Sequence, residues 1–66
     1  MFKIIKNEFN HPVVMAKETE KECLKWIWNE LKSWEYADYY YPTIEKFEIW
    51  YNKIPDYNKS YLIEEF

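Results

Sequence analysis

The chain has 66 residues and a formal net charge of −3, and 23% of its residues are Phe, Trp or Tyr. A chain this short buries only about 60% of its unfolded surface, so we expect one small domain spanning residues 1–66, stabilised by dense aromatic packing. The acidic balance argues against nonspecific nucleic-acid binding, and the absence of Arg argues against direct reading of bases.

The N-terminal segment predicts a β-hairpin. Residues 2–9 (FKIIKNEF) alternate imperfectly, with Phe2 and Ile4 on one face, and residues 12–16 (PVVMA) form a short β-branched run. Asn10, His11 and Pro12 lie between them and have turn chemistry, because Asn tolerates left-handed geometry and the residue before a proline avoids the helical region.

Thr19–Trp34 (TEKECLKWIWNELKSW) is the one long segment with a clean helical period. Thr19 and Glu22 form a capping-box pattern, in which the Thr hydroxyl accepts from the backbone N–H of residue 22. At about 100° per residue, one face of this helix is apolar and predicts the core stripe, formed by Leu24, Ile27, Trp28 and Leu31. We expect the helix to end between Ser33 and Ala37.

Trp26 lies roughly 200° from Leu24 on this helix, nearly opposite the stripe. Two interpretations remain open for it. It is either a ring half-covered by Lys side chains or by the following loop, or an anchor for a partner, since Trp is enriched at interface hot spots.

The segment that follows, residues 35–43 (EYADYYYPT), has no settled period. Its three consecutive tyrosines, residues 39–41, cannot all face one core, so at least one is expected to be exposed or to cover another surface. This tyrosine loop is long enough to fold over Trp50 if that side chain is otherwise exposed.

The C-terminal third predicts a second hairpin. Residues 45–52 (EKFEIWYN) alternate well, with Phe47, Ile49 and Tyr51 on one face and Trp50 on the other. Residues 53–58 form a turn around Pro55-Asp56, and residues 59–66 a last strand with Tyr61 and Ile63 inward. The predicted fold is therefore α+β: a two-layer domain of hairpin, helix and hairpin, with a mainly antiparallel four-stranded sheet, one helix on one face, and Trp50 and Leu62 on the open face.

The sequence offers little for catalysis. Cys23 is the only cysteine and His11 the only histidine, so an internal disulfide is excluded and the usual ligand set for zinc is absent. A Cys–His dyad is disfavoured, because a cysteine in an amphipathic helix is usually structural. Without Gly there is no phosphate-binding loop. We therefore expect a non-enzymatic protein with no cofactor and no metal, located in the cytoplasm and without a signal peptide or membrane span.

Aromatic side chains that the predicted core does not need, together with an acidic rim, are typical of a protein-binding surface. The residues we expect to bind a partner are Trp26, Glu30, Trp34, Asp38, Tyr40 and Trp50. The acidic side chains of the helix and the following loop suit docking on a basic cleft. Ordinary solubility is the favoured explanation of these acids, because Lys21, Lys25 and Lys32 are interleaved with them.

The hairpin, the capped TEKECLKWIWNEL helix and the Tyr-rich return ending in YLIEEF resemble the very small, acidic, aromatic-rich proteins of phages and prophages of low-GC bacteria. Such proteins include anti-CRISPR and other inhibitors of host defence. The resemblance implies a stand-alone accessory protein that acts by binding.

The leading hypothesis is an inhibitor that occludes a functional surface of a larger host protein, such as a nucleic-acid-binding nuclease or defence complex. Two alternatives remain. One is a homodimeric structural or regulatory protein whose aromatic side chains pair with themselves. The other is a weak binder of single-stranded nucleic acid that stacks bases on Trp and Tyr.

Overall fold

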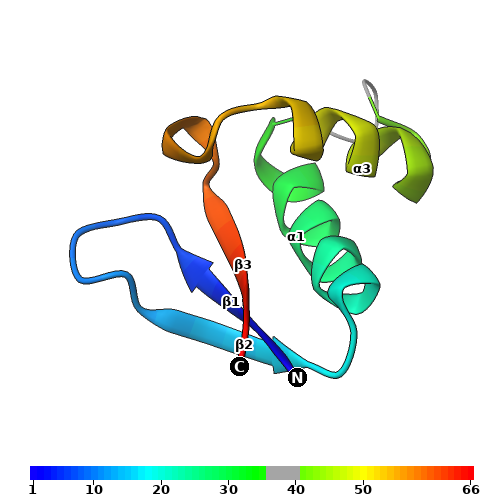
Figure 1. Cartoon of the computed structure of the whole chain (residues 1–66). Coiled ribbons are helices and arrows are strands. Elements are labelled where there is room, and N and C mark those ends of the chain that lie inside the picture. Colours follow the sequence, from blue (N-terminus) through cyan, green and yellow to red (C-terminus); the bar gives the residue numbers. More distant parts are fainter. Residues whose placement is uncertain (36–40) are drawn as a thin grey trace.

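In the part of the chain that the computed structural model describes, two helices pack with a three-stranded antiparallel sheet (Figure 1). The structure describes residues 1–35 and 41–66, and the side chains of Trp34 and Glu35 lie outside this description. The elements in chain order are β1 (Phe2–Lys6), β2 (Val13–Lys17), α1 (Glu20–Glu35), α3 (Ile44–Lys53), the 3-10 turn η1 (Asp56–Asn58) and β3 (Tyr61–Glu65).

The N-terminal hairpin is confirmed, although β1 is shorter than predicted. β1 and β2 pair antiparallel, with an irregularity between Ile4 and Ile5. Asn10 and His11 have φ values of 79° and 45°, in the left-handed region that both residue types tolerate better than most. The turn therefore reverses the chain without glycine.

The sheet has the order β2-β1-β3, so the last strand pairs with the first. Ile4 of β1 is paired with Ile63 of β3, and the two side chains share the face that packs on the helices. Ile5 and Leu62 are paired on the opposite face, as predicted for Leu62. Tyr61 and Ile63 pack against the core, which confirms their predicted inward orientation.

The predicted central helix is confirmed as α1. The backbone N–H of Glu22 donates to Oγ1 of Thr19 at 3.1 Å, which satisfies a donor at the helix start. Leu24, Ile27 and Leu31 are buried, whereas Trp28 is half-buried. Cys23 is also fully buried, because α1 contacts the strands on one side and α3 on the other.

The strand predicted for residues 45–52 is wrong: this segment is helix α3, so the sheet has three strands rather than four. Thr43 caps the helix by accepting from the backbone N–H of Lys46, and Glu45 places negative charge in the first turn. Phe47 and Tyr51, four residues apart, are its buried side chains. The same letters fit period two and period 3.6, and the cap together with packing on α1 favours the helix.

The core lies between the sheet, α1 and α3. Its buried side chains come from all three, and they are Ile4, Cys23, Leu24, Ile27, Leu31, Phe47 and Tyr51. Neither helix, over the residues that the structure describes, is long and apolar enough to cross a membrane.

Candidate partner-binding site

The outer face of α3 carries the candidate site. Lys46, Ile49, Trp50 and Lys53 follow the spacing i, i+3, i+4, i+7, which places them on one side of a helix. Phe47 and Tyr51 lie on the other side and are buried against α1. Helix α3 therefore buries its apolar side in the core and exposes a face that carries both apolar and basic side chains.

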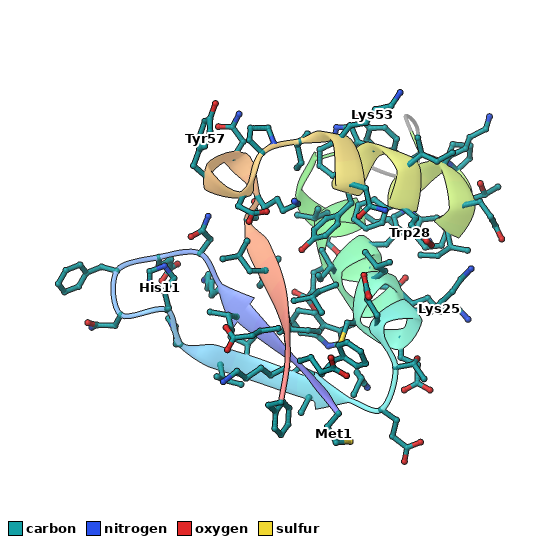
Figure 2. All side chains as sticks on the ribbon, in the orientation of Figure 1. Met1, His11, Lys25, Trp28, Lys53 and Tyr57 are labelled. Atoms are coloured by element: carbon teal, nitrogen blue, oxygen red, sulfur yellow. The ribbon has the colours of Figure 1, made fainter. Side chains whose placement is uncertain are left out.

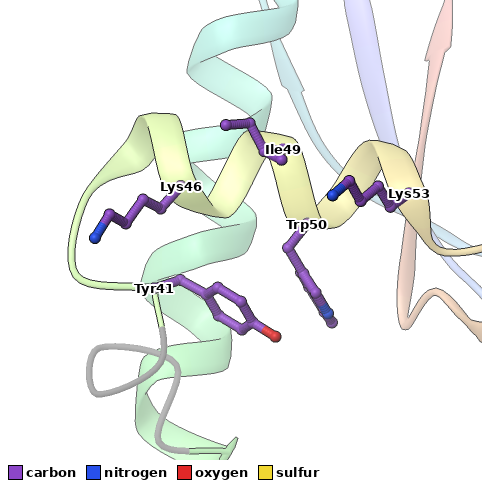
Figure 3. A pocket seen from close by; sticks show the side chains of 5 residues that line it. All are labelled: Tyr41, Lys46, Ile49, Trp50 and Lys53. Atoms are coloured by element: carbon purple, nitrogen blue, oxygen red, sulfur yellow. The ribbon is translucent and has the colours of Figure 1, made fainter.

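Tyr41, just before the helix, completes this surface, which we call the α3 shelf: Tyr41, Lys46, Ile49, Trp50 and Lys53 (Figure 3). The rings of Tyr41 and Trp50 are stacked with centroids 4.8 Å apart and an interplanar angle of 29°. The five side chains line a shallow hollow with a volume of about 330 Å³. Ile49 is 57% exposed at its edge, which leaves apolar surface available for contact.

Contacts beneath the shelf hold Tyr41 in place. The indole N–H of Trp28 donates to the backbone oxygen of Tyr41 at 2.9 Å, linking α1 to the segment that leads into α3. The Tyr41 ring also meets the buried Phe47 ring edge-on, with centroids 6.4 Å apart. Phe47 in turn lies 5.5 Å from the Trp50 ring. The stack is thus supported by the core.

Two lysines give the shelf a positive charge. Lys46 and Lys53 are both exposed, and no ion pair joins either of them to a side chain of the described ranges 1–33 and 41–66. Of the acids of the same helix, Glu48 projects roughly 160° from Lys46. Glu45 lies one turn before Ile49 and about 40° from it around the helix, at the margin of the shelf. The shelf therefore differs in sign from the chain as a whole, whose net charge is −3.

The arrangement of the α3 shelf is suited to binding another molecule. A stacked aromatic pair and an exposed Ile provide apolar contact area at low conformational cost, and two flexible ammonium groups provide charge at its margins. Aromatic residues with a charged rim are typical of protein-binding surfaces.

Of the six residues predicted to bind a partner, Trp50 is part of the α3 shelf. Trp26 and Glu30 are half-buried on α1. Trp34 is near the end of α1 but its side chain is outside the described part, and Asp38 and Tyr40 lie outside the described residues altogether.

Trp26 occupies a different part of the molecule from Trp50. Its ring meets Tyr61 of β3 at 89°, with centroids 5.4 Å apart, and packs against the core. The sheet thus covers one side of this ring, whereas the predicted covering came from Lys side chains or from the loop after α1. The exposed remainder lines a shallow hollow with Lys17, Glu22, Lys25 and Asn29.

One face of α1 is basic. Lys21, Lys25 and Lys32 share one helix face, since their spacings of four and seven correspond to nearly whole turns. The ammonium group of Lys32 lies 3.6 Å from the centroid of the Trp28 ring, a cation–π contact. The idea of an acidic α1 face docking on a basic cleft therefore receives no support from this side of the helix.

Cys23 and His11 occupy separate regions. Burial, reinforced by the nearby Glu20 and Glu22, raises the pKa of the Cys23 thiol, and its Sγ lies 3.9 Å from the backbone oxygen of Phe2. A raised pKa disfavours the thiolate that nucleophilic chemistry needs. His11 is exposed at the outer end of the hairpin, away from α1 (Figure 2).

Comparison of the chain with known protein families, curated proteins and solved structures finds no match.

Sequence reasoning missed Lys46, Ile49 and Lys53, whereas the predicted cover of Trp50 by the tyrosine loop is observed for Tyr41. The signal was present, because Thr43 followed by apolar residues at positions 44, 47 and 51 is a cap and a helical stripe. Interpreting residues 45–52 as a strand placed Ile49 with Phe47 on the inward face and separated it from Trp50. On the helix, Ile49 and Trp50 are neighbours on the outer face.

Proposed function

We propose that the chain is a small, non-enzymatic inhibitor that binds a larger host protein through the α3 shelf and occludes a functional surface of that protein. The observation that carries the proposal is the supported Tyr41–Trp50 stack beside an Ile49 side chain that is 57% exposed. A small domain gains little stability from exposed apolar surface, so a preorganised apolar patch favours a binding role.

The general character that the chain shares with accessory proteins of phages and prophages points to a bacterial host cytoplasm as the place of action. The target class to test first is a nucleic-acid-binding nuclease or a defence complex. An inhibitor that covers a functional surface of its target needs no catalytic group. The binding surface of the chain is sufficient for inhibition.

A matched pair of variants tests the proposal. Ile49→Asp introduces a carboxylate into the α3 shelf, whereas Asn52→Asp introduces the same charge at an exposed position roughly 60° or more outside the shelf on the same helix. Tagged wild type and both variants are incubated with nuclease-treated lysates of low-GC bacteria, and retained proteins are identified by mass spectrometry. We expect one stoichiometric host protein to be retained by wild type and Asn52→Asp and lost with Ile49→Asp.

Circular dichroism on both variants first establishes that they keep the wild-type helix content. Retention of the same host protein by Ile49→Asp would place binding elsewhere on the chain. Recovery of the bait alone from every lysate would contradict the inhibitor hypothesis and favour the homodimeric alternative.

A further inference from the structure

We propose that the α3 shelf recognises an acidic segment of its partner, in which two carboxylates flank one apolar side chain. This inference rests on the proposed function and adds the chemistry of the partner. It follows from the signs, spacing and apolar content of the shelf residues.

The spacing of the two lysines sets the spacing of the carboxylates. Lys46 and Lys53 are seven residues apart on α3, which corresponds to about 10 Å along a helix axis at roughly 1.5 Å per residue. In a polyproline II segment, residues i and i+3 lie on the same side and about 9 Å apart. An acid–x–x–acid segment in this conformation therefore matches the lysine pair.

The surface between the lysines is apolar. Ile49 and the stacked Trp50 lie between them in the sequence and on the same face of the helix. An aliphatic side chain placed between the two carboxylates would lie over the hollow that Ile49 and Trp50 line. The two ion pairs then align the segment along the helix, while the apolar centre supplies contact area.

A protein segment fits this shelf better than single-stranded nucleic acid. Stacking of bases requires an open ring face, and the Trp50 ring already contacts the rings of Tyr41 and Phe47. The chain has no Arg and a net charge of −3, which opposes binding to a phosphate backbone over any longer stretch.

Nuclear magnetic resonance on the isotope-labelled chain tests the peptide chemistry directly. The probe is a capped peptide containing Glu-Pro-Leu-Glu, compared with Gln-Pro-Leu-Gln, with Glu-Pro-Ser-Glu and with an oligothymidylate. We expect the first peptide to shift the Ile49 methyl and Trp50 indole resonances. The Gln peptide should bind about tenfold more weakly, because two exposed ion pairs are lost.

Charge-matched double variants of the chain test the role of the two shelf lysines. Lys46→Glu with Lys53→Gln removes both shelf cations, and Lys21→Glu with Lys25→Gln makes the same change in charge on exposed positions of α1. Glu at position 46 also lies three residues after the capping Thr43, which suits the helix start. We expect the affinity of the shelf variant for the acidic peptide to be about tenfold lower than that of the wild type. The α1 variant should keep most of the wild-type affinity.

Equal binding of the Glu and Gln peptides, tighter binding of the oligothymidylate, or no shift at millimolar peptide would each overturn the inference. The lysate experiment separates this failure from failure of the proposed function. If the host protein is lost with Ile49→Asp but retained by the Lys46→Glu/Lys53→Gln variant, the shelf binds a partner that is not acidic. If no host protein is retained by the wild type, the proposed function itself fails.

Discussion

At the scale of single residues, Tyr51 connects α3 with the start of β3. Its hydroxyl donates to the backbone oxygen of Tyr61 at 2.8 Å, and its ring packs on Phe47. We expect Tyr51→Phe to lower the free energy of unfolding by about 1 kcal/mol, the usual net contribution of such a hydrogen bond. Urea unfolding followed by fluorescence measures the difference, and an unchanged midpoint would show that the bond contributes nothing.

The same residue gives the chain a pH dependence. Burial, with a smaller contribution from Asp56, raises the pKa of Tyr51 above its ordinary value. The unfolded state therefore releases this proton first, near pH 10, and binds fewer protons than the folded state above that pH. The contribution of the protonated Tyr51 hydroxyl to the free energy of unfolding is therefore complete below about pH 10 and is lost as the pH rises further. The difference in unfolding free energy between wild type and Tyr51→Phe should shrink over that range; a constant difference would contradict this.

Cys23 provides a second test of burial at one position. The side chain is 0% exposed and burial raises the pKa of its thiol, so both access and the thiolate fraction are low. We expect labelling by iodoacetamide at pH 8 to be slow in the folded chain and fast in concentrated urea, as measured by mass spectrometry. Rapid labelling without urea would mean that the contact between α1 and the sheet opens readily.

At the scale of elements, the start of α3 depends on Thr43. Its hydroxyl accepts from the backbone N–H of Lys46 at 3.3 Å, and Glu45 adds negative charge in the first turn. We expect Thr43→Ala to cost about 1 kcal/mol of stability and Thr43→Ser to cost little, since Ser keeps the acceptor. Urea unfolding of the two variants checks this. Equal losses would attribute the effect to the Thr methyl group instead of the cap.

The two helices show where sequence reasoning succeeds and where it fails. For α1, the cap at Thr19 and the stripe of Leu24, Ile27 and Leu31 agree with one another, and both are observed. For residues 45–52, alternation of aromatic and charged side chains fits a strand as well as a helix. The cap at Thr43 and the spacing of Ile44, Phe47 and Tyr51 favour the helix, and contacts with α1, which the sequence alone does not show, stabilise it.

The wrong prediction of a strand for residues 45–52 also explains why only part of the candidate site was predicted. Trp50 was predicted as a binding residue because it was surplus to the expected core, and it lies on the α3 shelf. Its neighbours Lys46, Ile49 and Lys53 depend on the helical period and could not be grouped on a strand. Trp26 was placed opposite the core stripe, but α1 has a second neighbour, the sheet, which supplies Tyr61 as a contact. A helix packed on two sides has no simple inner and outer face.

At the scale of the whole molecule, Asn7 ties the N-terminal hairpin to the C-terminal third of the chain. Its side-chain amide donates to the backbone oxygens of Asp56 and Lys59, at 3.0 and 2.8 Å, and its backbone N–H donates to that of Ser60 at 2.9 Å. One residue after β1 therefore fixes the approach of the chain to β3. The two side-chain contacts join positions 49 and 52 residues apart in sequence.

We expect Asn7→Ala to lower the free energy of unfolding by about 1–2 kcal/mol, because two side-chain hydrogen bonds are lost together. Asn58→Ala, at an exposed position within η1, is the matched control and should cost clearly less. Urea unfolding measures both losses in free energy of unfolding. Amide hydrogen exchange shows where the Asn7 variant is destabilised: protection from exchange should fall more in β3 and η1 than in α1. A uniform loss of protection over all elements would show instead that the domain opens as one cooperative unit, with Asn7 contributing no more locally than any other contact.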